Sequence, residues 1–206
     1  MKNVYLDTET TGLNPGQIGQ LTVIIEDTDL NKVETKNYFF EVSEMEEGAQ
    51  KIHGFSIEDL RSLSGGKKFA DYKDELLSIF NNATLIAHNL PFDEKFISSE
   101  FWRTGISFKP FGRYDTMQYF TNIVKIPSRS RFSKGGYKFP KLSEVGSFFN
   151  VNIDKVKEYT NRLFCGSDKE QGFHDARFDT TLMYVCVNLE RERLNGGNSW
   201  HNMFCN

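Results

Sequence analysis

The sequence predicts an α/β domain with a mixed five-stranded sheet and flanking helices. Two observations predict this fold class. Segments rich in β-branched residues and separated by turns fill the N-terminal part of the chain, which is typical of an antiparallel three-stranded meander. After them, short apolar runs alternate with segments of helical spacing, which is typical of parallel strands connected by helices.

The meander is expected to begin at the short apolar run of residues 4–6 and to continue with strands at 17–26 and 33–42. Residues 43–63 have the pattern of short helices. One of these helices begins with a capping box, in which Ser56 and Asp59 satisfy each other's backbone N–H groups.

Helices and two further strands follow in alternation, and Pro91 suits the first turn of one of these helices. In chain order we expect a helix at 69–80, a strand at 84–87, a helix from Pro91, a strand that closes at Asp115, and helices through 119–120 and over 142–149, 151–163 and 173–193.

Length and composition are those of a soluble globular protein. The 206 residues favour one domain over 1–194, followed by a short polar tail at 195–206. A net charge of −3 excludes a global cationic field for nucleic acid but allows a local basic patch. Three widely spaced cysteines argue against a zinc site or a disulfide framework. Because no signal-like segment or membrane-length apolar run occurs, we expect a cytoplasmic protein that does not contact a membrane.

Two carboxylates stand side by side where the first strand is expected to end. Asp7 and Glu9 are two residues apart, so on a strand they point to the same face. Folding alone gives no reason for this pair, because like charges repel and burial of either is costly. A divalent cation removes the conflict, since hard cations bind clustered carboxylate oxygens. The pair therefore predicts a metal site, although a solvated strand end is the alternative.

Two later stretches also place acidic or imidazole groups beside the end of an element. Asp93 lies in the first turn of a helix, where a carboxylate ordinarily interacts with the helix dipole. His174 precedes the last long helix and Asp179 lies on it, where a solvated position is the alternative. Three such stretches in one chain favour a shared chemical site over three separate structural roles.

Together, these motifs resemble those of the DEDDh (DnaQ-like) 3′–5′ exonucleases. The resemblance is carried by Leu-Asp-Thr-Glu-Thr-Thr-Gly-Leu at 6–13, His-Asn-x-x-Phe-Asp at 88–93 and His-x-Ala-x-x-Asp at 174–179. Ile52-His53-Gly54 and Asp115-Thr116 also match patterns that recur in the family. The similarity extends over nearly the whole chain, from about residue 3 to residue 193.

The resemblance implies an RNase H-like fold and the hydrolysis of phosphodiester bonds from a free 3′ end, with release of mononucleotides. It also implies a general base at His174 and four metal-binding carboxylates, which are Asp7, Glu9, Asp93 and Asp179. Two Mg²⁺ or Mn²⁺ ions about 4 Å apart would stabilise the attacking and leaving oxygens. Four carboxylates would balance the charge of two such ions. A histidine can accept the proton of water near neutral pH.

Substrate contacts are expected in two places. By the resemblance, the terminal nucleotide would be lined by Thr10, Leu13, Ile52 and His53. Separately, residues 125–141 combine six basic side chains with interleaved aromatic ones, and no Asp or Glu occurs from 116 to 143. Such a segment can hold a single-stranded backbone and stack bases, with Arg129, Arg131 and Lys134 among its candidate contacts. A solvated loop is the alternative.

Single-stranded DNA with a free 3′ end is the expected substrate. An exoribonuclease of the same fold is the nearest alternative, because the sequence does not identify contacts to a 2′-hydroxyl group. A nucleic-acid-binding accessory module that does not cleave is a second alternative, and a small-phosphate hydrolase is a third. The full set of catalytic residue types argues against the second, and residues 125–141 argue against the third.

The sequence departs from the family pattern in two places. One concerns the binding partners of the protein, and the other concerns the number of its catalytic acidic residues. The short segment after residue 193 favours a stand-alone nuclease, although a polymerase or a second copy of the chain is a possible partner. Gln20 stands where many relatives have Glu, so no additional catalytic acid is expected there.

Overall fold

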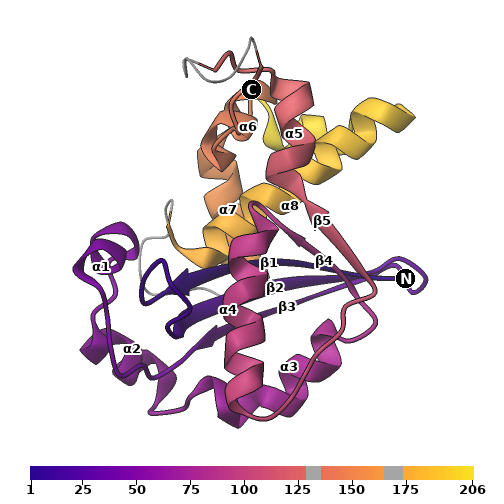
Figure 1. The fold of residues 1–206 in the computed structure, drawn as a ribbon. Coiled ribbons are helices and arrows are strands. Elements are labelled where there is room, and N and C mark those ends of the chain that lie inside the picture. Colours follow the sequence, from indigo (N-terminus) through magenta and orange to yellow (C-terminus); the bar gives the residue numbers. More distant parts are fainter. Residues whose placement is uncertain (129–135, 165–173) are drawn as a thin grey trace.

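The computed structural model describes residues 1–128, 136–164 and 174–206, and Figure 1 shows their arrangement. A five-stranded sheet lies in the middle of the molecule, with the strands in the order β3-β2-β1-β4-β5. β2 is antiparallel to both of its neighbours, β1 and β3. β4 is parallel to both of its neighbours, β1 and β5. The predicted mixed sheet, a meander joined to parallel strands, is confirmed.

The strands are β1 (Lys2–Thr10), β2 (Ile18–Asp27), β3 (Lys32–Phe39), β4 (Thr84–Ala87) and β5 (Gly112–Asp115). The helices are α1 (Glu47–His53), α2 (Ile57–Ser64), the 3-10 helix η1 (Phe69–Tyr72), α3 (Lys73–Phe80), α4 (Leu90–Arg103), α5 (Thr116–Val124), α6 (Leu142–Phe148), α7 (Ile153–Leu163), α8 (Ala176–Asn195) and α9 (Ser199–Phe204). None of these helices has both the length and the apolar character needed to cross a bilayer.

β1 is longer than the apolar run that predicted it. Its pairing with β2 continues to Thr10, with a register shift between Glu9 and Thr10. Its pairing with β4 ends at Tyr5, because β4 is a short strand. The carboxylate pair therefore lies within β1, on the part of the strand that has only one neighbour. The strand extends beyond the apolar run because backbone pairing with β2 does not depend on apolar side chains.

The sheet has a hydrophobic core on each face, because alternate residues of β1 point to opposite sides. Leu6 packs in one core with Phe96 of α4. Tyr5 packs in the other core with Phe178 of α8. Asp7 and Glu9 follow Tyr5 at two-residue spacing, so they face α8, whereas Thr8 faces α4.

The helix boundaries follow local hydrogen bonding. The predicted capping box of α2 is present, with Ser56 Oγ accepting from Asp59 N at 3.0 Å and Asp59 Oδ2 accepting from Ser56 N at 3.0 Å. The single helix expected at 69–80 is divided into η1 and α3. Asp71 caps the start of η1 by accepting from the backbone N–H of Lys68 at 2.7 Å.

The segment after residue 194 differs from the polar tail that we expected. It forms α9, and Phe204 and Cys205 are buried in the core that α8 covers. Trp200 stacks on Phe204, with ring centroids 5.4 Å apart. The surrounding asparagines and glycines gave the segment a polar composition, but its apolar residues at helical spacing pack onto α7 and α8.

Candidate active site

Three carboxylates converge at the carboxyl end of β1. Asp7 and Glu9 project from the face of the strand that meets α8, and Asp179 lies in the first turn of that helix. One oxygen from each carboxylate lies within 4.8 Å of the others. Glu9 is buried, whereas Asp7 and Asp179 are partly exposed. The structure thus brings together three of the predicted metal ligands, and we call them the carboxylate cluster.

The fourth predicted ligand approaches from the other face of the sheet. Asp93 is buried in the first turn of α4. Its Oδ1 accepts hydrogen bonds from Thr8 N at 3.1 Å and from Thr8 Oγ1 at 2.7 Å. Because β4 does not reach this part of β1, the carboxylate satisfies a backbone N–H that no strand pairs. Asp93 therefore adjoins the carboxylate cluster but is not one of the three residues whose carboxylate oxygens lie within 4.8 Å of one another.

Burial raises the pKa of all four carboxyl groups. The pKa values of Asp7 and Glu9 lie well above their ordinary range, because desolvation and then the neighbouring carboxylates disfavour the charged form. Desolvation also raises the pKa of Asp93 and that of Asp179 to about 7. No Lys or Arg of the described ranges forms an ion pair with any of the four.

The donor set fits a divalent cation. Asp179 Oδ1 is buried and has no hydrogen-bond partner among the residues described, while Oδ2 accepts from His174 N at 3.0 Å. A buried acceptor that faces two further carboxylates is unfavourable unless a positive charge is supplied. Oxygen ligands in such a cluster are those that Mg²⁺ and Mn²⁺ prefer. The carboxylate cluster is therefore a candidate metal centre.

A cavity of about 280 Å³ opens beside Glu9. Leu13 and Ile52 line it although their side chains are 73% and 57% exposed, so apolar surface is presented to solvent next to the carboxylate cluster. The lining includes the four residues predicted to contact a terminal nucleotide, which are Thr10, Leu13, Ile52 and His53. We call this the lateral cavity. An apolar wall beside a metal centre suits the face of a nucleobase.

His53 holds the backbone at the edge of the lateral cavity. Its Nδ1 accepts from Phe55 N at 3.1 Å, so Nε2 carries the hydrogen and donates to Thr10 O at 3.3 Å. Burial lowers the pKa of His53, and the nearby His174 lowers it further. A neutral His53 therefore fixes the end of β1, in addition to lining the lateral cavity where the resemblance predicted it.

His174 is exposed, immediately before α8, with φ at 69°. This left-handed conformation costs a non-glycine residue on the order of 1 kcal/mol. The hydrogen bond from its backbone N to Asp179 ties the residue to the carboxylate cluster. The predicted base is therefore held next to the predicted metal ligands by the local fold of the α8 start.

The basic segment is described only at its two ends. The candidate contacts Arg129, Arg131 and Lys134 lie outside the described residues. Pro127 and Tyr137 form an antiparallel bridge, and the ring Nε2 of His88 is 2.9 Å from Pro140 O. Because His88 follows β4, this contact anchors the segment at the end of the sheet where β1 carries the carboxylates.

Sequence reasoning missed three residues of this region. Thr8 donates two hydrogen bonds to Asp93. Its position between Asp7 and Glu9 in the strand predicts a side chain on the opposite face from theirs, and this could have identified it. Glu46 lies against Gly12 beside the lateral cavity, so that a Cβ at position 12 would require the Glu46 carboxyl group to move. Gln20 was set aside as a neutral replacement, yet it pairs with Glu9 in the register of β1 and β2 and is fully buried.

Comparisons with known proteins point to one family. The RNase_T family profile, described as Exonuclease, matches residues 4–147. The DNA polymerase III subunit epsilon of Rickettsia felis is 36% identical over 104 residues, which are 48% of this chain and 44% of that protein. A DNA polymerase III of PolC type from Mycoplasmopsis pulmonis is 27% identical over 154 residues, covering 73% of this chain and 10% of its own length.

The fold is similar to that of a solved nuclease. E. coli Exonuclease I in complex with a dA16 oligonucleotide superposes with a TM-score of 0.64 at 16% identity, over 92% of this chain and 40% of that one. At this identity the likeness concerns the fold, and the predicted architecture is confirmed. The chain spans less than half the length of the epsilon subunits that it matches.

Proposed function

The chain belongs to the RNase_T exonuclease family, and on this premise we propose that it is a metal-dependent 3′–5′ exonuclease that acts on single-stranded DNA and releases mononucleotides. One observation carries the proposal. The carboxylate cluster, which forms no ion pair with a cationic side chain of the described residues, adjoins a cavity of about 280 Å³ with apolar walls, which can admit a nucleobase. DNA is favoured because the relatives are named as DNA polymerase III subunits and the similar solved nuclease carries a deoxyadenosine oligonucleotide.

In this proposal Asp7, Glu9 and Asp179 hold the metal, and Asp93 adds its charge from the opposite face of the sheet. Two Mg²⁺ or Mn²⁺ ions, when bound, would stabilise the charge that develops on the attacking and leaving oxygens. The chain itself contributes the rigidity of the site, because β1 fixes two carboxylates and the hydrogen bonds of Thr8 fix the fourth. Such preorganisation lowers the cost of reaching the transition state.

His174 is proposed as the general base. It lies beside Asp179 and is exposed, so its imidazole can accept a proton from a water molecule on the solvent side of the carboxylate cluster. The imidazolium can return this proton to bulk solvent, and the leaving 3′-oxygen takes up a proton from solvent as the phosphodiester bond breaks. Its left-handed backbone and its hydrogen bond to Asp179 limit the directions from which it can act.

The lateral cavity is proposed to take the base of the 3′-terminal nucleotide. Leu13 and Ile52 would contact the face of the base, and His53 would keep Thr10 in place beneath it. The segment 125–141, anchored by His88, is proposed to hold the strand that leads to this cavity. A DNA polymerase or a second copy of the chain is a candidate partner, the former because the relatives are named as DNA polymerase III subunits.

The test is time-resolved degradation of single-stranded DNA and RNA of matched sequence, labelled at the 5′ end, with Mg²⁺, Mn²⁺ or EDTA. We expect a metal-dependent ladder that shortens from the 3′ end, with mononucleotides as products and with DNA lost faster than RNA. Asp7→Asn and His174→Ala should each lose activity by at least about 100-fold. Asp154→Asn, at an exposed carboxylate on α7, is the matched control and should keep full activity.

Each alternative gives a different result. Faster loss of RNA would identify an exoribonuclease, and longer products would exclude release of mononucleotides. Shortening from the 5′ end would contradict the assigned polarity. Retained binding without any hydrolysis, in the presence of either metal, would replace the proposed enzyme with a binding module.

A further inference from the structure

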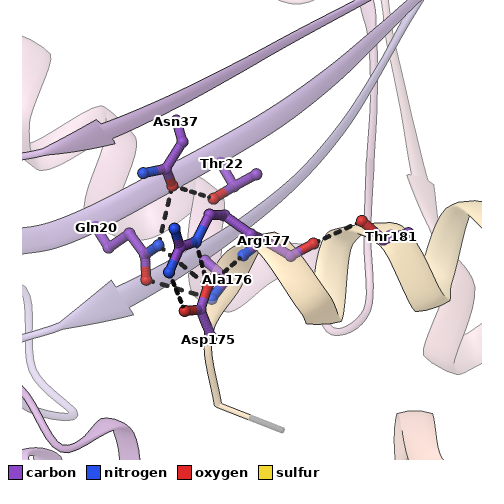
Figure 2. A network of polar contacts seen from close by, with 7 residues as sticks. All are labelled: Gln20, Thr22, Asn37, Asp175, Ala176, Arg177 and Thr181. Atoms are coloured by element: carbon purple, nitrogen blue, oxygen red, sulfur yellow. Dashed lines mark hydrogen bonds and ion pairs between the residues drawn. The ribbon is translucent and has the colours of Figure 1, made fainter. Parts of the chain in front are cut away.

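A buried polar network connects the meander to the start of α8 (Figure 2). Gln20 and Thr22 of β2, Asn37 of β3, and Asp175 and Arg177 at the start of α8 form it. The network lies next to the carboxylate cluster, because Gln20 pairs with Glu9 in the sheet and Asp175 is four residues before Asp179. None of its members is among the predicted catalytic residues.

Gln20 is fully buried and uses both ends of its amide. Its Oε1 accepts from Ala176 N at 3.3 Å, and its Nε2 donates to Asn37 Oδ1 at 2.9 Å and to Asp175 Oδ1 at 3.3 Å. Asn37 is in turn fixed by Thr22, whose hydroxyl donates to it at 2.6 Å. The amide of Gln20 therefore joins two strands of the sheet to the first residues of α8.

The carboxylate of Asp175 is fully occupied within the network. Its Oδ1 accepts from Arg177 N at 3.0 Å and from Arg177 Nε at 2.9 Å, and its Oδ2 accepts from Arg177 Nη2 at 2.6 Å. Both side chains are buried, and the Arg177 guanidinium also lies 5.8 Å from the centre of the Phe39 ring. Asp175 is thus a fifth acidic group near the cluster, but it is paired with Arg177, and both of its oxygens already accept hydrogen bonds.

The same residues set the position of the metal ligand on α8. Asp179 N donates to Asp175 O at 3.0 Å in the first turn, and Asp179 Oδ2 accepts from the backbone N of His174. A shift of Asp175 would consequently move both of these residues. We propose that Gln20, acting through Asp175 and Ala176, is a positioning residue that fixes the start of α8 against the sheet so that Asp179 reaches Asp7 and Glu9. This inference rests on the proposed function.

The test measures metal binding and catalysis separately. Gln20→Met keeps the length of the side chain and removes all three hydrogen bonds, and Gln20→Glu keeps only the acceptor for Ala176 N. We expect Gln20→Met to weaken Mn²⁺ binding, measured by titration calorimetry without substrate, by about 10–100-fold. Its kcat at saturating Mn²⁺ should fall with KM changed less than about threefold, because Gln20 does not line the lateral cavity. Gln20→Glu places a carboxylate oxygen against Asn37 Oδ1 and Asp175 Oδ1, so it should weaken Mn²⁺ binding at least as much as Gln20→Met.

Thr160→Val is the matched control, because it removes an equally buried hydrogen bond, from Thr160 Oγ1 to Val156 O, in α7. It should lower the melting temperature and leave Mn²⁺ affinity and kcat unchanged. Wild-type Mn²⁺ affinity in both Gln20 variants, or losses that Thr160→Val reproduces, would overturn the positioning role. If Gln20→Met does not fold, Gln20→Glu alone decides by the same criterion.

The two proposals fail in distinguishable ways. A wild type that binds Mn²⁺ but hydrolyses no nucleic acid overturns the proposed function, and the positioning role is then judged on Mn²⁺ affinity alone. A wild type that binds no Mn²⁺ overturns both.

Discussion

Each carboxylate of the carboxylate cluster destabilises the metal-free fold, and a bound cation would offset this cost. Burial and the neighbouring carboxylates raise the pKa of Asp7 and of Glu9, so the charged form of each is unfavourable in the folded protein. No cationic side chain in the described part of the chain forms an ion pair with any of the three carboxylates of the cluster. Replacing one of them with its neutral amide keeps the size of the side chain and removes one charge. Stability and metal binding should therefore change in opposite directions in such variants.

Asp179→Asn tests this opposition. In EDTA at pH 8 the variant should be more stable than the wild type, by roughly 1–3 kcal/mol, because a buried and repelled charge is lost. Mn²⁺ should stabilise the wild type and not the variant. The measurement is the free energy of unfolding with and without Mn²⁺, and Asp154→Asn is the surface control that should change neither value. A variant less stable than the wild type in EDTA would contradict the electrostatic account.

The backbone of His174 gives a second prediction at this scale. Its φ of 69° suits glycine, so His174→Gly should be more stable than His174→Ala by about 1 kcal/mol. Both variants lack the imidazole and should be equally impaired in hydrolysis. Chemical denaturation of the pair, beside single-turnover assays, checks both statements. Equal stability of the two variants would show that the left-handed conformation is not strained.

At the scale of elements, α9 contributes to the core, although the polar composition of its segment predicted a tail without a structural role. Phe204 is fully buried, so Phe204→Ala should cost about 3–5 kcal/mol of unfolding free energy. His201 lies on the same helix and is exposed, so His201→Ala should change stability by less than about 0.5 kcal/mol. Thermal unfolding of both variants decides. A polar tail without a structural role would give two small effects.

The elements, and the three carboxylates that the structure brings together, could be located from the sequence, because periodicity and motif order are local properties. The extent of β1 could not, since its last residues pair with β2 through backbone groups that any side chain allows. The roles of Gln20 and Thr8 were missed because both depend on contacts between distant segments. The sequence around a glutamine in a strand does not indicate which distant residues its amide will hydrogen-bond.

At the scale of the whole molecule, the acidic centre should make stability depend on pH. Folding raises the pKa of Asp93 to about 7, so the stability that its protonated form contributes is present at low pH and lost as the pH rises through about 7. Asp93→Asn removes this titration and keeps an oxygen for Thr8. In EDTA, the stability of the variant relative to the wild type should therefore increase between pH 5 and pH 8, by on the order of a few kcal/mol.

The measurement is chemical denaturation of both proteins across that pH range. The difference between the two proteins reports the titration of Asp93 together with the change that loss of its charge makes in the pKa values of Asp7 and Glu9. Mg²⁺ at pH 8 should stabilise the wild type more than the variant. A difference that stays constant with pH would mean that Asp93 is charged in the folded protein throughout.

The carboxylate cluster joins residues from the two ends of the sequence, since β1 opens the fold and α8 is the last long helix. During translation, Asp7 and Glu9 leave the ribosome long before Asp179 is synthesised. Contacts between such distant segments also form late in folding, because closing a long loop is entropically costly. A growing chain thus has no complete carboxylate cluster. The candidate metal centre is assembled only when the last long helix docks on the sheet.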